Sequence, residues 1–283
     1  MKKFFAAICA CALLLTGCGG GEKSSEAPKG DSKATIGVIS HLNASETEYN
    51  EYMKKLEQSY RPSKANLSAE YKYFNKMNDM QLALESGQID VLSTYRNVAE
   101  YMLQKSSDKE ILPSERYLED SFCFALREGD TKLKNELNKA IKAMIADGTL
   151  GKLSKQYITD LKEDVEPPAV PITHIDGADT IKVAVTGDLP PFDLVLADGT
   201  PAGFSTAVLA EISRRIEKNI EIVTVDSAAR ASILSSKGAD VVFWVSVPKD
   251  SILIPANIDQ PTGIAVSEPY YHDLITHIGK KSS

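Results

Sequence analysis

Hydrophobic residues in the first part of the chain alternate between the spacing of strands and that of helices. Short apolar runs predict strands at 34–40, 67–74 and 89–94. After the first run, Ser45 and Glu48 form a capping box that starts an amphipathic helix. Further helices are predicted at 79–86 and 98–104. Strands and helices in this alternating order predict a parallel sheet with right-handed crossovers.

The same rhythm returns in the second part of the chain. The elements predicted there are strand 181–185, helix 205–216, strand 220–225, helix 228–236 and strand 241–245. In each part the second helix ends at a glycine, with an aspartate before the next strand: Gly87 and Asp90, then Gly238 and Asp240. The matching order favours two similar lobes. Two unrelated α/β units are the alternative, since a glycine often ends a helix.

A proline-rich stretch separates the two parts. It follows a predicted strand at 122–126 and two helices at 132–146 and 150–158, and it contains Pro167, Pro168 and Pro171. Two α/β lobes leave a cleft at the carboxyl ends of their strands, where such sheets bind ligands. The predicted organisation is a leader at 1–17, a tether at 18–33, a lobe segment with closing helices at 34–160, a linker at 161–179 and a second lobe segment at 180–283.

The first residues have the pattern of an export signal. Lys2 and Lys3 precede an apolar stretch at 4–15 that is too short to span a bilayer. The run LTGC at 15–18 resembles the lipobox of bacterial lipoproteins, which implies acylation of Cys18; an ordinary signal peptide with an incidental cysteine is the alternative. Residues 19–33 are almost free of apolar side chains and predict a flexible tether. We therefore expect an extracytoplasmic protein that is held at the lipid bilayer.

Charge and motif content exclude several classes of function. The chain of 283 residues has a net charge of −7, and removal of the two leader lysines leaves −9, without a basic block that could bind nucleic acid. There is no phosphate loop, serine elbow or cysteine pair. His272 and His277 lie five apart on a predicted strand and point to opposite faces, which makes a poor metal pair. Cys123 lies in an apolar strand and is predicted to be inert. The sequence predicts no catalytic residue, metal or cofactor, and hence no enzyme.

Several motifs resemble those of one protein family. They are LESGQID at 84–90, a strand and helices at 124–157, LPPF at 189–192, DG at 198–199, GF at 203–204 and SEPYY at 267–271. Together they resemble the bacterial extracellular solute-binding proteins of family 3, the polar amino acid receptors of ABC importers. The resemblance implies a two-lobed α/β fold of the periplasmic-binding-protein type, with mainly parallel sheets flanked by helices and a ligand cleft between the lobes.

The order of these motifs differs from that of the family. In the family the half with the PPF motif comes first, whereas here it follows the proline-rich linker. The simplest explanation is a circular permutation in which the linker joins the former ends and the new ends lie near the interlobe crossover. Two independent half-domains, each needing a partner, are the alternative.

Aromatic residues are candidates for the wall of the cleft. The resemblance places Phe192 at an aromatic wall, although a core residue at the strand end fits equally well. Trp244 is the only tryptophan and lies at the carboxyl end of a predicted strand, where a pocket wall belongs; a core residue near the hinge is the alternative. Ser246 is positioned either to donate to a ligand or to cap a turn, and Tyr95 and Tyr270 complete an aromatic set.

The charged groups that recognise an α-amino acid are not at the positions that the resemblance implies. The family's arginine after the third strand is missing, and Lys249 does not reproduce its bidentate geometry. Arg230 is either a displaced substitute or an exposed helical residue. The family's acidic residue falls on Tyr95, next to Arg96, which would attract an anion instead. Asn43 and Ser45 open a helix whose free N–H groups either hold an anion or are simply capped.

These inferences lead to one prediction of function. We expect a membrane-anchored substrate-binding lipoprotein that binds a small, amino acid-like solute and delivers it to an ABC permease. The alternative is a sensor or scaffold lipoprotein on the same fold that has altered or lost its ligand.

Overall fold

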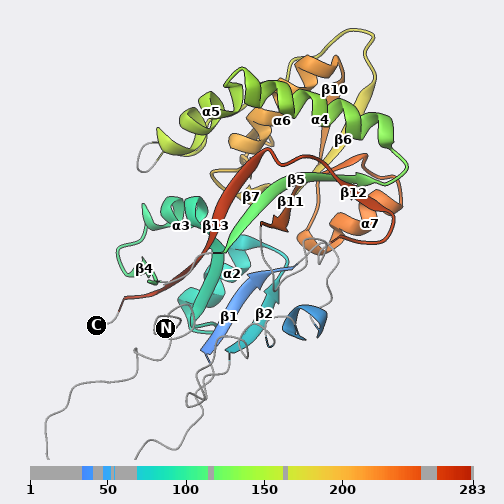
Figure 1. Ribbon diagram of the computed structural model, residues 1–283. Coiled ribbons are helices and arrows are strands. Elements are labelled where there is room, and N and C mark those ends of the chain that lie inside the picture. The colour runs from blue at the N-terminus through green and yellow to red at the C-terminus, as the bar shows by residue number, and fades with distance from the viewer. Residues whose placement is uncertain are drawn as a thin grey trace, which may run out of the picture.

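The computed structural model consists of two α/β lobes joined by two long strands (Figure 1). It describes residues 34–40, 47–51, 54, 69–113, 118–161, 165–249 and 260–281. The leader, the proposed lipidation site Cys18 and the segment with Asn43 and Ser45 lie outside these residues. No helix in the described part of the chain is long and apolar enough to cross a bilayer.

The first lobe, here called the N-lobe, is built by the first part of the chain. Its sheet has the order β2-β1-β3-β13, with β4 on the far side of β13, and β1 pairs in parallel with both β2 and β3. Gly87 ends α2 in the left-handed region, with φ of 75°, so the chain can turn back into β3. The elements are β1 (Ala34–Ile39), β2 (Ala69–Phe74), α2 (Met77–Ser86), β3 (Val91–Tyr95), α3 (Arg96–Leu103) and β4 (Lys109–Ile111).

The second lobe, here called the C-lobe, has the sheet order β10-β6-β11-β5, with β12 also on β5. Strand β6 pairs in parallel with β10 and β11, and α4 and α5 pack against α6. Its first elements are β5 (Glu119–Arg127), α4 (Thr131–Ala146), α5 (Thr149–Ser154), a π-helical turn (Lys155–Thr159) and β6 (Thr180–Val185). Then follow β7 (Asp188–Leu189), β8 (Asp193–Val195), β9 (Pro201–Ala202), α6 (Phe204–Ile216), β10 (Asn219–Thr224), a 3₁₀ turn (Ser227–Ala229), α7 (Arg230–Ser235), β11 (Val241–Pro248), β12 (Ile264–Val266) and β13 (Tyr271–Lys280).

The two lobes share one hydrogen-bonding pattern at the start of their central strands. In the N-lobe, Asp90 accepts a hydrogen bond from Thr35 N–H through Oδ2 at 2.8 Å, and its own N–H donates to Thr35 O at 2.9 Å. In the C-lobe, Asp240 makes the same pair of bonds with Lys182, at 3.0 and 2.8 Å. Both aspartates therefore orient loops, and the lobes have equivalent architecture at equivalent positions.

Strands β5 and β13 connect the lobes. Residues 271–274 of β13 pair antiparallel with β5, and residues 275–279 pair antiparallel with β3 of the other lobe. In Figure 1 the red β13 and the green β5 run side by side between the lobes. A polypeptide crossing of this kind is where a two-lobed protein can bend.

The segment 165–179 lies along the C-lobe. Val170 N–H donates to Pro201 O at 2.9 Å, and the buried Asn219 side chain bonds to the backbone of Ile175 and Ala178 at 2.8 and 3.0 Å. The proline-rich stretch after the closing helices is therefore held on the lobe by backbone hydrogen bonds.

Most of the predicted elements are confirmed, with shifts of a few residues at their ends. The parallel pairing predicted for both parts of the chain is also confirmed. Short strands β4, β7, β8, β9 and β12 were not predicted, because two or three residues are too few for a periodic signal. Residues 47–51 are helical, as expected after the capping box.

Candidate functional site: the interface between the lobes

The amino terminus of α2 meets the C-lobe directly. Met77 N–H donates to Asp188 Oδ2 at 2.7 Å, and Ser227 N–H donates to the backbone oxygen of Asn75 at 3.3 Å. Lys76 Nζ lies 3.3 Å from Asp226 Oδ1, an ion pair between exposed side chains. These three contacts link residues at strand and helix ends of opposite lobes, so the interface is closed at this point.

Arg230 reinforces this contact from a buried position. Only 3% of the residue is exposed, its Nη2 donates to Ser40 O of the N-lobe at 3.1 Å, and its Nε donates to Ser227 O at 3.2 Å. The guanidinium therefore ties the start of α7 to the end of β1 across the interface. An exposed helical arginine, which was one of the two expectations for this residue, is wrong.

A short hairpin positions Asp188. Asp193 is buried, and its Oδ2 accepts three hydrogen bonds, from the N–H and hydroxyl of Thr186 and from Gly187 N–H, at 3.0 to 3.1 Å. Burial raises the pKa of Asp193 to about 6, against the effect of these hydrogen bonds. Burial also raises the pKa of Asp188, although the Met77 N–H and the charges of Lys76 and Arg230 oppose the shift.

Glycine is required where this hairpin meets α6. Gly203 precedes Phe204 with φ of 95°, and a Cβ at this position would lie 2.6 Å from Phe192 O. The close approach lets Phe204 N–H donate to Pro191 O and Ser205 N–H to Phe192 O, both at 2.9 Å. The LPPF and GF motifs therefore form one packed corner beside the interface.

A family model for bacterial extracellular solute-binding proteins, family 3, matches residues 51–160 and 181–248, which is more than half of the chain. The chain belongs to the bacterial extracellular solute-binding proteins of family 3. Its α/β architecture is the two-lobed, periplasmic-binding-protein type that the sequence motifs implied. A comparison with curated proteins gives no match.

The solved structures that match this chain are distant in sequence. A ligand-binding component of an ABC-type import system from Staphylococcus aureus is 14% identical, with 87% of this chain and 65% of that chain covered and a TM-score of 0.43. This chain thus spans less than two thirds of the length of the Staphylococcus aureus protein. A nutrient-binding protein from Burkholderia cenocepacia, bound to methionine, is 13% identical, with 87% of this chain and 84% of that chain covered and a TM-score of 0.41. The OxyR2 regulatory domain from Vibrio vulnificus is 14% identical (92% of both chains, TM-score 0.44).

The aromatic residues expected at the cleft wall lie in a packed cluster at the hinge. Phe192 is fully buried, and its ring centroid lies 4.9 Å from that of Phe122 and 5.3 Å from that of Tyr271. Tyr270 is 4% exposed and stacks on Phe124 at 4.7 Å. This burial agrees with the alternative of a core residue for Phe192, and its role as a ligand wall stays a prediction.

Tyr95 and Arg96 lie where β3 gives way to α3. The Tyr95 ring lies 4.6 Å from that of Phe122, and its hydroxyl donates to Asp120 Oδ2 at 3.3 Å. Arg96 Nε donates to Glu100 at 2.8 Å on an exposed helical face. An acidic group is therefore present near Tyr95 after all, but it comes from β5 instead of from β3.

Two further candidates are described only in their backbone. Trp244 and Ser246 belong to β11, where Ser246 pairs with Phe122 of β5; their side chains lie outside the described residues, as do Asn43 and Ser45. Lys249 Nζ lies 3.0 Å from Glu119 and is thus engaged in an ion pair. Of the predicted binding residues whose side chains the structure describes, Arg230 lies at this contact between the lobes, where it bonds to Ser40 O and Ser227 O.

The residues of this contact that were not predicted are Ser40, Asn75, Lys76, Met77, Asp188, Asp226 and Ser227. All follow strand ends on one lobe or the other, and the rule that α/β sheets bind at the carboxyl ends of their strands pointed to that region. In the described residues no cluster of His, Cys, Asp and Glu that could hold a metal is present.

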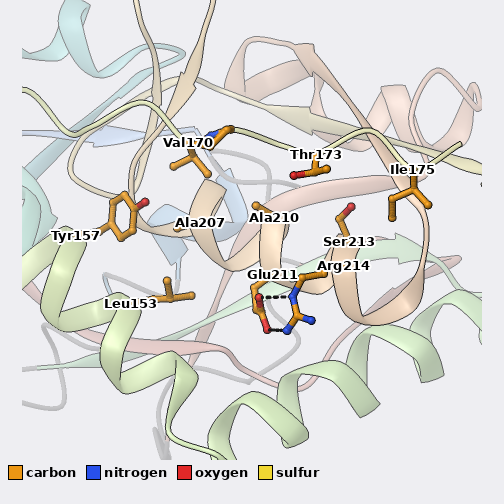
Figure 2. Close-up of a pocket in the computed structure, with 11 residues that line it drawn as sticks. Leu153, Tyr157, Val170, Thr173, Ile175, Ala207, Ala210, Glu211, Ser213 and Arg214 are labelled. Atoms are coloured by element: carbon orange, nitrogen blue, oxygen red, sulfur yellow. Dashed lines mark hydrogen bonds and ion pairs between the residues drawn. The ribbon is translucent and has the colours of Figure 1, made fainter.

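A separate pocket of about 370 Å³ lies within the C-lobe (Figure 2). Leu153 and Tyr157 form one wall, α6 a second wall and the 170–175 segment the third. Glu211 and Arg214 close one end through two hydrogen bonds, of 2.6 and 3.0 Å. Because every lining residue belongs to one lobe, occupancy of this pocket would not link the two lobes.

Proposed function

We propose that this protein is the extracytoplasmic substrate-binding lipoprotein of an ABC importer. It binds a small solute between its lobes and delivers that solute to a permease in the membrane. One observation carries the proposal: two α/β lobes of a solute-binding family meet at the ends of their strands and helices, across a two-strand hinge. Closure about such a hinge buries a solute and creates the form that a permease can recognise.

The interlobe contacts suggest how closure is controlled. Opening the lobes would break the Asp188–Met77 and Arg230–Ser40 hydrogen bonds and expose buried charged groups. A solute that bridges the lobes adds contacts to the closed form only, and it shifts the equilibrium by its difference in affinity for the two forms. The protein's own contacts therefore set how much binding energy the solute must supply.

Anchoring at the membrane is part of the same proposal. Residues 1–17 act as a signal peptide, Cys18 carries the lipid, and residues 18–33 form the tether. This division is supported by the lysines and apolar run of the leader and by the polar composition of the tether. A tethered receptor stays close to its permease, which raises its effective concentration there.

We also propose that the chain is circularly permuted relative to its family. In support, both lobes have an equivalent parallel core, and β13 begins beside β5 in the C-lobe and ends beside β3 in the N-lobe. The motif order predicts a new terminus near this crossing. The half-domain alternative predicts dimers, so the molecular mass of the protein in solution separates the two.

A second candidate is a sensor or scaffold that has lost transport. The contacts of Asp188, Lys76 and Arg230 with the opposite lobe favour it, because they join the lobes directly through groups of the protein itself. Small-angle scattering of the purified protein, with and without saturating solutes, combined with uptake by a deletion strain, distinguishes the two. Transport predicts a more compact particle with solute and impaired uptake of that solute in the deletion strain. An unchanged scattering profile together with normal uptake would leave only the sensor or scaffold.

A further inference from the structure

The pocket within the C-lobe (Figure 2) takes no part in the contact between the lobes, and its walls are mainly aliphatic. Ala207 and Ala210 lie three residues apart, on the same side of α6. Because their side chains end at Cβ, they leave a shallow, flat surface that a planar ring can cover. The other aliphatic lining residues are Leu153, Val170, Pro171 and Ile175. A volume of about 370 Å³ is within the range of small-molecule sites.

The π-helical turn at Lys155–Thr159 brings a tyrosine to this pocket. Asp160 N–H donates to Lys155 O at 2.8 Å, which is the i to i+5 hydrogen bond of such a turn. Turns of this kind are rare and occur frequently at functional sites. Tyr157 is buried, and in Figure 2 its hydroxyl points toward Val170.

The Tyr157 hydroxyl is available to a bound molecule. Across the described residues, it has no hydrogen-bond partner within the protein. Burial raises the pKa of Tyr157, so the group stays a neutral hydroxyl that can both donate and accept. The pocket therefore combines an aliphatic lining with one polar group that a ligand can satisfy.

The charged groups at the end of the pocket are matched within the protein. Arg214 donates to both carboxylate oxygens of Glu211, at 2.6 and 3.0 Å. Arg215 donates to the same carboxylate at 2.6 Å and to Asp147 at 2.8 Å. The Arg214 hydrogen bond holds the pKa of Glu211 below its usual range, so this carboxylate stays ionised and paired. A charged ligand would have to disrupt these pairs to be compensated, and the pocket therefore favours a neutral one.

We propose that this pocket is a second binding site, apart from the region between the lobes, for a small neutral aromatic compound of the phenol or indole type. The ring packs between Leu153 and the alanines of α6, and its hydroxyl or ring N–H bonds to Tyr157. Apolar cavities in proteins take up molecules such as benzene, and a single polar partner fixes their orientation. The site goes beyond the proposed function, because it uses none of the interlobe contacts.

Methyl-group NMR of the full-length chain in detergent micelles tests this site. The probes are phenol and indole, with benzoate and benzylammonium as charged counterparts of similar size. Aromatic rings shift the methyl resonances that they cover, so Leu153, Val170 and Ile175 report binding here. Because micelles also take up the probes, dialysis against empty micelles gives their free concentrations. We expect saturable shifts with at least one neutral probe and a Kd of about 1 mM or tighter.

A variant that fills the pocket locates the binding. Ala210→Leu places a larger side chain on the flat surface of α6 and should weaken binding of the neutral probe by at least about tenfold. Ala143→Leu makes the same substitution at an exposed position of α4 outside the pocket, and it should bind like the wild type.

A second variant separates the hydrogen bond from the packing. Tyr157→Phe should lower the affinity for phenol by about 2- to 10-fold while leaving that for toluene unchanged. Benzoate or benzylammonium bound as tightly as phenol would overturn the neutral class of ligand. Equal binding by Ala210→Leu and Ala143→Leu, or wild-type methyl resonances that no probe shifts, would overturn the site. The proposed function would stand in each case, because the contact between the lobes is not involved.

Discussion

Asp188 should stabilise the closed arrangement of the lobes, and its replacement measures by how much. The variant Asp188→Ala removes the acceptor that Met77 N–H meets at 2.7 Å, together with its charge near Lys76 and Arg230. A hydrogen bond to a charged group is worth about 1.5–3 kcal/mol. Burial of the carboxylate offsets part of this, since it raises the pKa of Asp188. We therefore expect a net loss of about 1–2 kcal/mol, which is about a 5- to 30-fold shift toward open forms.

Single-molecule energy transfer between the lobes can measure this shift. Cysteines at the exposed positions Leu82, on α2, and Ile145, on α4, would carry the dyes, and the chain would start at residue 34. Asp79→Ala is the matched control, because Asp79 is an exposed aspartate in the first turn of the same helix, and among the described residues its carboxylate makes no hydrogen bond or ion pair. Equal open fractions in Asp188→Ala and Asp79→Ala would refute the reasoning that Asp188 links the lobes.

Three further outcomes follow from buried titratable groups. Because the pKa of Asp193 is raised to about 6, the free energy of unfolding of the wild type should fall by up to about 3 kcal/mol relative to that of Asp193→Asn as the pH rises from 4 to 6. Urea unfolding at several pH values measures this difference. A difference in stability that does not change with pH would contradict the prediction. Burial lowers the pKa of His277 to about 4, so the free energy of unfolding of the wild type should fall by up to about 3 kcal/mol relative to that of His277→Gln as the pH falls from 6.5 to 4. The same urea unfolding series tests this, and a rise in relative stability over that pH range would contradict it. Burial raises the pKa of Cys123 to about 12, so a disulfide reagent at pH 8 should label this thiol only after unfolding, and rapid labelling of the native protein would exclude the buried position.

The sequence predicted the parts of the fold that depend on local patterns. Alternating apolar segments gave the parallel cores of both lobes, and the glycine–aspartate pattern marked equivalent positions. Asp90 and Asp240 indeed bind the backbone of the neighbouring central strand in the same manner. Local spacing is informative here because each of these interactions stays within one βαβ unit.

The interlobe contact could not be predicted in the same way. Asp188 and Met77 are 111 residues apart, and no periodicity relates a residue on one lobe to its partner on the other. Arg230 looked like a surface residue from its helical context, but packing of the lobes buries it against Ser40. Similarly, the burial of Phe192 depends on the crossing of β5 and β13, which places Phe122 and Tyr271 against its ring.

The central claim is that the two lobes close on a small solute, and native mass spectrometry tests it most directly. The protein would be purified gently from a bacterial host and examined intact, then again after unfolding in the gas phase. The account predicts a monomer that carries one small molecule, which is lost when the chain unfolds. A monomer that stays empty, and whose melting temperature no amino acid or small organic acid raises, would contradict the claim.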